Sequence, residues 1–154
     1  MRFRKYDSMN QDTKKALKDF FSGQKKLNQL GIIRSKNYLD DVGKYLCKVM
    51  YNLELTKSRR QASYDGMIGS SKIQIKINNC PTGTPVRLVE PIEFDELIVV
   101  LAPNSFLRPE NIQHDFIFYK FTREDALKKF KTSSGNYIGG KKIFSQGYDK
   151  NLSL

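Results

Sequence analysis

The chain has little of several residue types on which common protein classes depend. It contains no tryptophan, one histidine and two cysteines among 154 residues. Cys47 and Cys80 lack the spacing of a metal-binding pair, and two cysteines are too few for a disulfide scaffold. Nothing in the surrounding sequence arranges His114 for catalysis. Cysteine-ligated metals, disulfide-stapled folds and histidine-based catalysis therefore receive no support.

Long apolar runs are also missing. No segment approaches the roughly 20 apolar residues that a membrane-spanning helix needs. Residues 1–5, MRFRK, are basic and lack the apolar core of a secretion signal. The sequence therefore predicts a cytoplasmic protein with no membrane partner.

Positive charge and aromatic residues are, by contrast, abundant. Lysine and arginine number 27 against 16 aspartates and glutamates, a formal net charge of +11 at pH 7. Such a surface attracts polyanions and releases their counterions, so nucleic acid is the first candidate partner, although ribosome-associated and membrane-surface proteins share this charge. With 10 Phe and 8 Tyr the chain can build a core, and its length predicts a single domain over 1–154.

The most informative stretch covers residues 64–78. Its second half, SKIQIKIN at 71–78, alternates isoleucine with polar residues, as a half-buried strand with one polar face requires. The shorter apolar segment before it ends in a GSS turn, so the two segments are expected to form a β-hairpin. Pairing them would bring Asp65 close to Gln74 and Lys76.

Two amphipathic helices are predicted before the hairpin. The first covers about 12–30, with Asp12 or Thr13 as its cap and Gly31 just past its end. Its expected buried stripe comprises Leu17, Phe20, Phe21, Leu27 and Leu30. The second covers about 38–50 and places Asp40 and Lys44 one turn apart, on the side opposite its apolar stripe.

The remainder predicts a mixed central sheet flanked by helices, an α/β architecture. Apolar segments at 97–101 and 116–121 indicate further strands, and Thr122 would cap a following helix. Residues 79–93 are expected to form a loop that could carry substrate recognition, with a short strand inside it. The basic, glycine-rich segment 132–154 is expected to be a tail of the domain.

The pattern of Asp65 followed by Gln74-x-Lys76 resembles the metal site of the PD-(D/E)xK nuclease superfamily. A longer resemblance, covering most of 31–130, is to small restriction-endonuclease-like proteins with the ordered motifs G-I-x-R-x-x-N, D-x-G-E-Y-L, Y-D and I-Q-V/I-K. The matching segments are GIIRSKN at 31–37, DVGKYL at 41–46, YD at 64–65 and IQIK at 73–76. The fold that this resemblance implies is a restriction-endonuclease-like mixed sheet flanked by helices.

The resemblance also implies a Mg²⁺-dependent DNA endonuclease. Asp65 and Gln74 would bind Mg²⁺, or Mn²⁺ in its place, because hard cations take oxygen ligands and a Gln carbonyl is an acceptable one. Lys76 would orient or deprotonate the attacking water. Double-stranded DNA would be the substrate, and because one such domain cuts one strand, a homodimer or a paired subunit is expected.

Lys44 departs from the family pattern, because it falls where those proteins have an acid. A lysine has only hydrogen-bond donors and a positive charge, so it cannot ligate Mg²⁺. Three explanations are open, in order of preference. The chain is an inactivated form of a nuclease, or a naturally inactive DNA-binding relative or subunit, or Asp40 takes the place of the missing acid. Lys44 thus joins Asp65, Gln74 and Lys76 as a candidate catalytic position.

Several further residues are candidates for contacts with nucleic acid. They are Arg34, Lys36, Asn37, Arg59, Arg60, Gln61 and Arg87. The alternative to a nuclease is a catalytically inactive DNA-binding module on the same fold. A third hypothesis, a basic interaction protein with no nucleic-acid role, would be favoured by positive residues scattered over the surface.

Overall fold

A computed structural model of the chain describes residues 9–57, 64–145 and 147–154. The chain divides into two compact units, Met1–Asp41 and Val42–Leu154, each of which is described by itself. The described residues contain three α-helices and a mixed sheet, so the predicted α/β class is confirmed. None of the helices in this part of the chain combines the length and the apolar character that crossing a bilayer requires.

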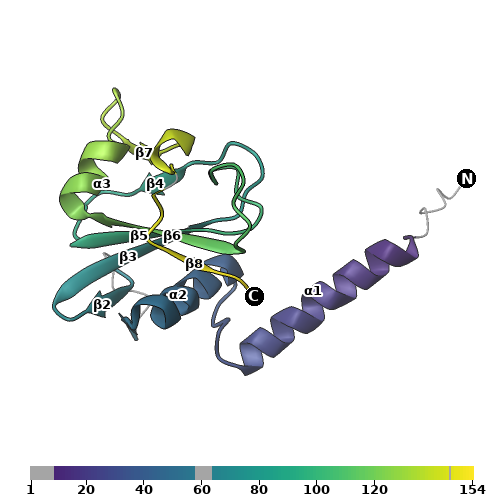
Figure 1. The fold of residues 1–154 in the computed structure, drawn as a ribbon. Coiled ribbons are helices and arrows are strands. Elements are labelled where there is room, and N and C mark those ends of the chain that lie inside the picture. Colours follow the sequence, from purple (N-terminus) through teal and green to yellow (C-terminus); the bar gives the residue numbers. More distant parts are fainter. Residues whose placement is uncertain (1–8, 58–63, 146) are drawn as a thin grey trace, which may run out of the picture. The chain divides into compact units, whose positions relative to one another are not determined.

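Helix α1 (Gln11–Gln29) is the main element of the first unit (Figure 1). Asn10 caps the N-terminus of this helix, and its side-chain oxygen accepts a hydrogen bond of 2.8 Å from Thr13 N. The predicted cap, Asp12 or Thr13, is therefore wrong, because Asn10 satisfies the first free amide groups of the helix. Gly31 follows the helix with φ +74°, as predicted for a glycine at a helix C-terminus.

The apolar stripe of α1 is present but is not buried. Leu17, Phe20 and Phe21 are 43%, 56% and 58% exposed, and no residue of the helix is classed as buried. Within the first unit by itself, the predicted stripe is therefore not buried. Helical periodicity identifies which side chains share a face, whereas burial of that face also requires a surface that packs against it.

The second unit is organised around a six-stranded sheet of order β1-β2-β3-β5-β6-β8. β3 and β5 are parallel, and the other neighbouring pairs are antiparallel. The predicted hairpin at 64–78 is confirmed, because Gly66 pairs with Ile73 and Ile68 pairs with Ser71. The strands are β1 (Glu54–Leu55), β2 (Gly66–Ile68), β3 (Ser71–Asn78), β5 (Glu96–Leu101), β6 (Phe116–Thr122) and β8 (Lys150–Leu152).

An apolar core lies on each face of this sheet. On one face, residues 42–51 of helix α2 (Tyr38–Tyr51) pack Leu46 and Cys47 against the isoleucines of β3. The other face carries α3 (Arg123–Phe130) and a separate two-stranded sheet of β4 (Val86–Leu88) and β7 (Tyr137–Gly139) (Figure 1). β5 lies between the cores, and its residues from Leu97 to Leu101 are fully buried, as the apolar run predicts.

Segment 132–154, expected to be a tail, instead belongs to the folded unit. Its strand β7 pairs with β4, a short 3₁₀ helix η1 (Lys141–Ile143) follows, and β8 closes one edge of the large sheet. Phe144 is 1% exposed and packs in the same core as Phe130. Strands of three residues show no periodicity of their own, so only pairing with β4 and β6 reveals them.

The close approach of β1 to β2 fixes glycine at position 66. A Cβ atom there would collide with Leu53 Cδ1 and would lie 2.7 Å from Glu54 O. We expect Gly66→Ala to lower the free energy of unfolding by about 1–3 kcal/mol through overpacking. Gly83→Ala, whose Cβ would have no heavy atom within 4 Å, should change it by less than about 0.5 kcal/mol. Urea unfolding of both variants tests this, and equal effects would contradict it.

Candidate functional site

The motif residue Asp41 has a structural role at the start of α2. Its carboxylate accepts hydrogen bonds from Arg34 N at 2.7 Å and from Ser35 Oγ at 2.9 Å. Ser35 Oγ in turn accepts from Asn37 N at 3.0 Å. The carboxylate is almost fully buried, so these donors offset its loss of hydration. The link from 31 to 37 is thereby fixed, while the side chains of Arg34, Lys36 and Asn37 remain exposed.

The next motif residue, Gly43, sets the distance between α2 and the sheet. A Cβ atom at this position would lie 2.9 Å from Ile77 Cβ, closer than ordinary packing allows. Glycine therefore lets the helix backbone lie directly over β3. As a consequence the neighbouring side chain of Lys44 reaches the sheet edge, where its Nζ lies 3.4 Å from Asp65 Oδ1.

Asp65 is held at this edge by its own backbone. Its N–H donates to Ile73 O at 2.7 Å, and its carbonyl accepts from Thr56 N at 3.0 Å, so it links β1 to β3. Its Oδ2 accepts from Ile75 N at 2.7 Å. From that hydrogen bond and standard bond lengths, Oδ2 lies within about 5 Å of the Cα of Gln74. Asp65 and β3 therefore meet between Gln74 and Lys76, as the hairpin predicts.

The Lys44–Asp65 ion pair is partly removed from solvent. The two side chains are 25% and 17% exposed. Burial, and secondarily the charge of Asp65, raises the pKa of the fully buried Cys47 thiol, so this thiol stays protonated at neutral pH. The negative charge of Asp65 thus lies near the buried Cys47 thiol, and Lys44 forms an ion pair with it.

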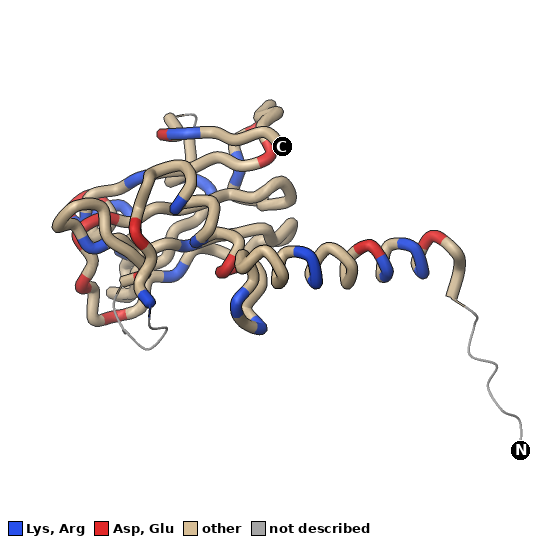
Figure 2. Tube along the Cα trace, turned by 90° about the horizontal axis from the view of Figure 1, so that it is seen from below, with Lys and Arg blue, Asp and Glu red and all other residues tan. Residues whose placement is uncertain are grey.

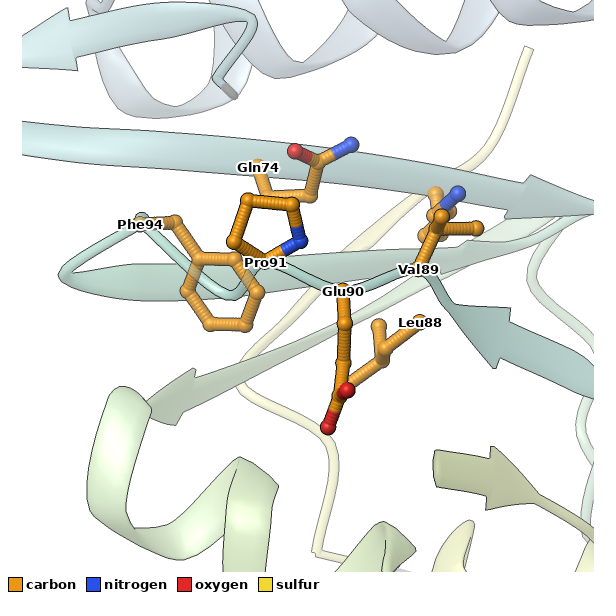
Figure 3. A pocket seen from close by; sticks show the side chains of 7 residues that line it. Gln74, Leu88, Val89, Glu90, Pro91 and Phe94 are labelled. Carbon is orange, nitrogen blue, oxygen red and sulfur yellow. The ribbon is translucent and has the colours of Figure 1, made fainter. Parts of the chain in front are cut away.

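Gln74 and Lys76 lie on the face of β3 opposite the isoleucines. Both line a pocket of about 120 Å³ whose other walls come from Leu88, Val89, Glu90, Pro91 and Phe94. Figure 3 shows the Gln74 side chain beside Pro91 and the Glu90 carboxylate turned away from the Gln74 amide. The structure therefore brings Gln74 and Lys76 together in one pocket, and Lys44 and Asp65 together in one ion pair.

The donor set around Asp65 does not fit a divalent cation. One carboxylate oxygen lies against the Lys44 ammonium and the other accepts the Ile75 N–H. Nowhere in 9–57, 64–145 and 147–154 do three His, Cys, Asp or Glu side chains gather as metal ligands would. A Mg²⁺ ion needs several oxygen ligands, and the ammonium would repel it.

The remaining predicted contact residues are distributed unevenly. Arg87 is exposed on β4, and Asp40 is exposed in the first turn of α2. Arg59, Arg60 and Gln61 lie outside the described residues. Figure 2 shows Lys and Arg positions along the α1 trace and over several elements of the second unit, with acidic positions between them.

Sequence reasoning missed two contributors to the surface around Lys76. Glu90 lines its pocket from the loop that was predicted to carry substrate recognition. Residues 135–138, from the expected tail, line a neighbouring pocket with Arg87. Glu90 could have been identified from the sequence, because it lies in the loop at 79–93 that is expected to carry substrate recognition. The local sequence does not indicate that β7 pairs with β4, because the two strands are about 50 residues apart in the chain.

The energetic coupling of Lys44 and Asp65 can be measured with a double-mutant cycle. Lys44→Met leaves a half-buried carboxylate without its counter-charge and should cost about 1–3 kcal/mol of stability. Asp65→Asn retains an acceptor for Ile75 N while removing the charge. We expect the double variant to be more stable than the sum of the single effects predicts, by about 0.5–1 kcal/mol. Strictly additive effects in urea unfolding would show that the pair contributes nothing.

Comparison with known proteins leaves the site to be interpreted from its own geometry. Neither the protein-family models nor the curated proteins compared with this chain match it. Two features therefore define the candidate site: the Lys44–Asp65 ion pair and the pocket that contains Gln74 and Lys76.

Proposed function

We propose that this chain is a DNA-binding domain of the PD-(D/E)xK type whose Lys44–Asp65 ion pair keeps it from the Mg²⁺-dependent chemistry of that superfamily. The observation that carries the proposal is the contact of 3.4 Å between Lys44 Nζ and Asp65 Oδ1. In the motif that the chain resembles, position 44 is acidic. Here a tethered cation lies against the carboxylate on which a metal ion would depend.

Three features support the superfamily assignment. The DVGKYL segment lies in α2, YD comes directly before β2, and IQIK lies within β3, whose Gln74 and Lys76 are on one face. Gly43 and Asp41 have structural roles that account for their places in the motif. Position 44 meets Asp65 in space, as an organising residue of the site should.

A double-stranded DNA partner is supported by charge and chemistry together. The net charge of +11 favours a polyanion. Lys and Arg are spread over several elements (Figure 2), a distribution that by itself suits a basic interaction protein as well as a nucleic-acid-binding one. Lys76 beside Gln74 supplies a local cation for a phosphate, and the Glu90 carboxylate that lines the same pocket is turned away from the Gln74 amide (Figure 3).

The second candidate function is a Mg²⁺-dependent deoxyribonuclease of restriction type, of which this chain is an inactivated form. The observation that favours it is that Asp65, Gln74 and Lys76 all remain at β3 and that only position 44 carries the wrong charge. An acid at 44 would add carboxylate oxygens beside Asp65, the ligands that Mg²⁺ prefers. Cleavage of both strands of a duplex would then need a second copy or a paired subunit.

Restoring the acid distinguishes the two functions. Plasmid DNA is incubated with Mg²⁺ or Mn²⁺ and with the unchanged chain, Lys44→Glu, or Lys44→Glu combined with Lys76→Ala. If the chain is an inactivated nuclease, Lys44→Glu gains metal-dependent cleavage and the added Lys76→Ala lowers it by about 10²–10³-fold. Lys48→Glu, an equal charge change at an exposed position of α2, is the matched control and should gain no activity.

The DNA-binding proposal makes its own prediction in the same samples. The unchanged chain should bind duplex DNA with an affinity that falls steeply as salt rises, because phosphate contacts release counterions. Binding without cleavage by any form supports the binding domain. An absence of DNA binding at low salt by the unchanged chain would refute the proposal.

A further inference from the structure

The two-stranded sheet of β4 and β7 presents a defined outer face. Its register pairs Val86 with Gly139, Arg87 with Ile138, and Leu88 with Tyr137. Val86 and Leu88 are buried in the core, and a Cβ on Gly139 would collide with the Phe130 ring, so this side faces inward. Because side chains alternate along a strand, Arg87 and Ile138 face outward.

Two exposed residues lie next to this outer face, one directly after β4 and one directly before β7. Val89 follows Arg87 by two positions and is 76% exposed. Asn136 precedes Ile138 by two positions and is also exposed. Arg87, Val89, Asn136 and Ile138 all line one pocket of about 330 Å³. We call these four residues the ribbon face.

From this arrangement we infer that β4 and β7 form a ribbon that enters the major groove of double-stranded DNA and reads base edges through Arg87 and Asn136. The inference rests on the proposed function and adds the element that would give it sequence preference. The major groove of B-DNA admits a two-stranded β-ribbon. Arginine pairs with the O6 and N7 acceptors of guanine, and asparagine pairs with N6 and N7 of adenine.

The other side chains of the pocket suit a base edge better than a phosphate. Val89 and Ile138 offer apolar contact for a thymine methyl group. The carboxylate of Glu90, which lines the same pocket, would repel a phosphate but accepts a hydrogen bond from the amino group of cytosine. The exposed Lys131 and Lys142, which flank β7 in sequence, are cations for the adjacent phosphates.

The ribbon face adjoins the pocket that contains Lys76. Leu88, Val89 and Glu90 line both pockets, so the two form neighbouring parts of one surface. A duplex whose major groove receives the ribbon would therefore pass its backbone close to Lys76. Double-stranded RNA is excluded as an equal partner, because its major groove is too deep and narrow for side chains to read.

Selection from a randomised duplex library tests the inference. The unchanged chain is bound to the library at moderate salt, and the enriched sequences are determined and used as labelled probes. Affinities for the enriched duplex, for single-base variants of it, and for the same sequence as double-stranded RNA are then measured for Arg87→Ala and Asn136→Ala. Arg123→Ala and Asn151→Ala, at exposed positions of α3 and β8 that do not line the pocket of the ribbon face, are the matched controls.

The expected result is a preferred DNA sequence whose discrimination at one base position falls by about 5- to 150-fold in each ribbon variant. Arg87→Ala should weaken the preference for guanine at one position, and Asn136→Ala should weaken the preference for adenine at another. Both control variants should keep the sequence preference of the unchanged chain. DNA binding without any enriched sequence, or an unchanged preference in both ribbon variants, would overturn the inference and leave the proposed function standing. Equal recognition of the RNA duplex would also overturn it. A failure to bind any DNA would instead refute the proposed function itself.

Discussion

The ion pair between Lys44 and Asp65 is the interaction on which the candidate site depends. It joins the helix that covers one face of the sheet to the edge where β2 begins. Its geometry is set from both sides, because Gly43 lets the helix approach β3 and the Asp65 carboxylate is anchored on Ile75 N. A charge held so firmly beside an apolar core needs a counter-charge, and the chain supplies one from its own sequence.

A tethered ammonium and a divalent metal ion satisfy the same carboxylate in different ways. The lysine neutralises Asp65 without offering a lone pair to substrate water, so it stabilises the fold but cannot polarise a phosphate or activate water as a metal does. Under the proposed function, such a domain would bind a substrate but lack the group that drives hydrolysis. Gln74 and Lys76, which line one pocket, would then belong to the binding surface.

The surface near Lys76 is assembled from segments that are far apart in the chain. β3 supplies Gln74 and Lys76, the loop after β4 supplies Glu90, and β7 supplies the strand that completes the ribbon. The inner side of that ribbon is fixed by Val86, Leu88 and the close approach of Gly139 to Phe130. Packing of the inner side against the core would hold Arg87 in place, as the proposed base reading requires.

The sequence alone determined the elements whose periodicity is local. The alternation of β3, the apolar run of β5 and the glycine that follows α1 each follow from the geometry of a few consecutive residues. It also placed Asp65 beside β3, because a hairpin turn fixes its own register. Tertiary structure alone decided that Lys44 lies next to Asp65, that Phe144 and β8 belong to the folded unit, and that β7 pairs with β4. These outcomes depend on which segments, distant in sequence, pack together. The hydrophobic periods of strands (two residues) and helices (3.6 residues) show which side chains share a face but not which element packs against that face.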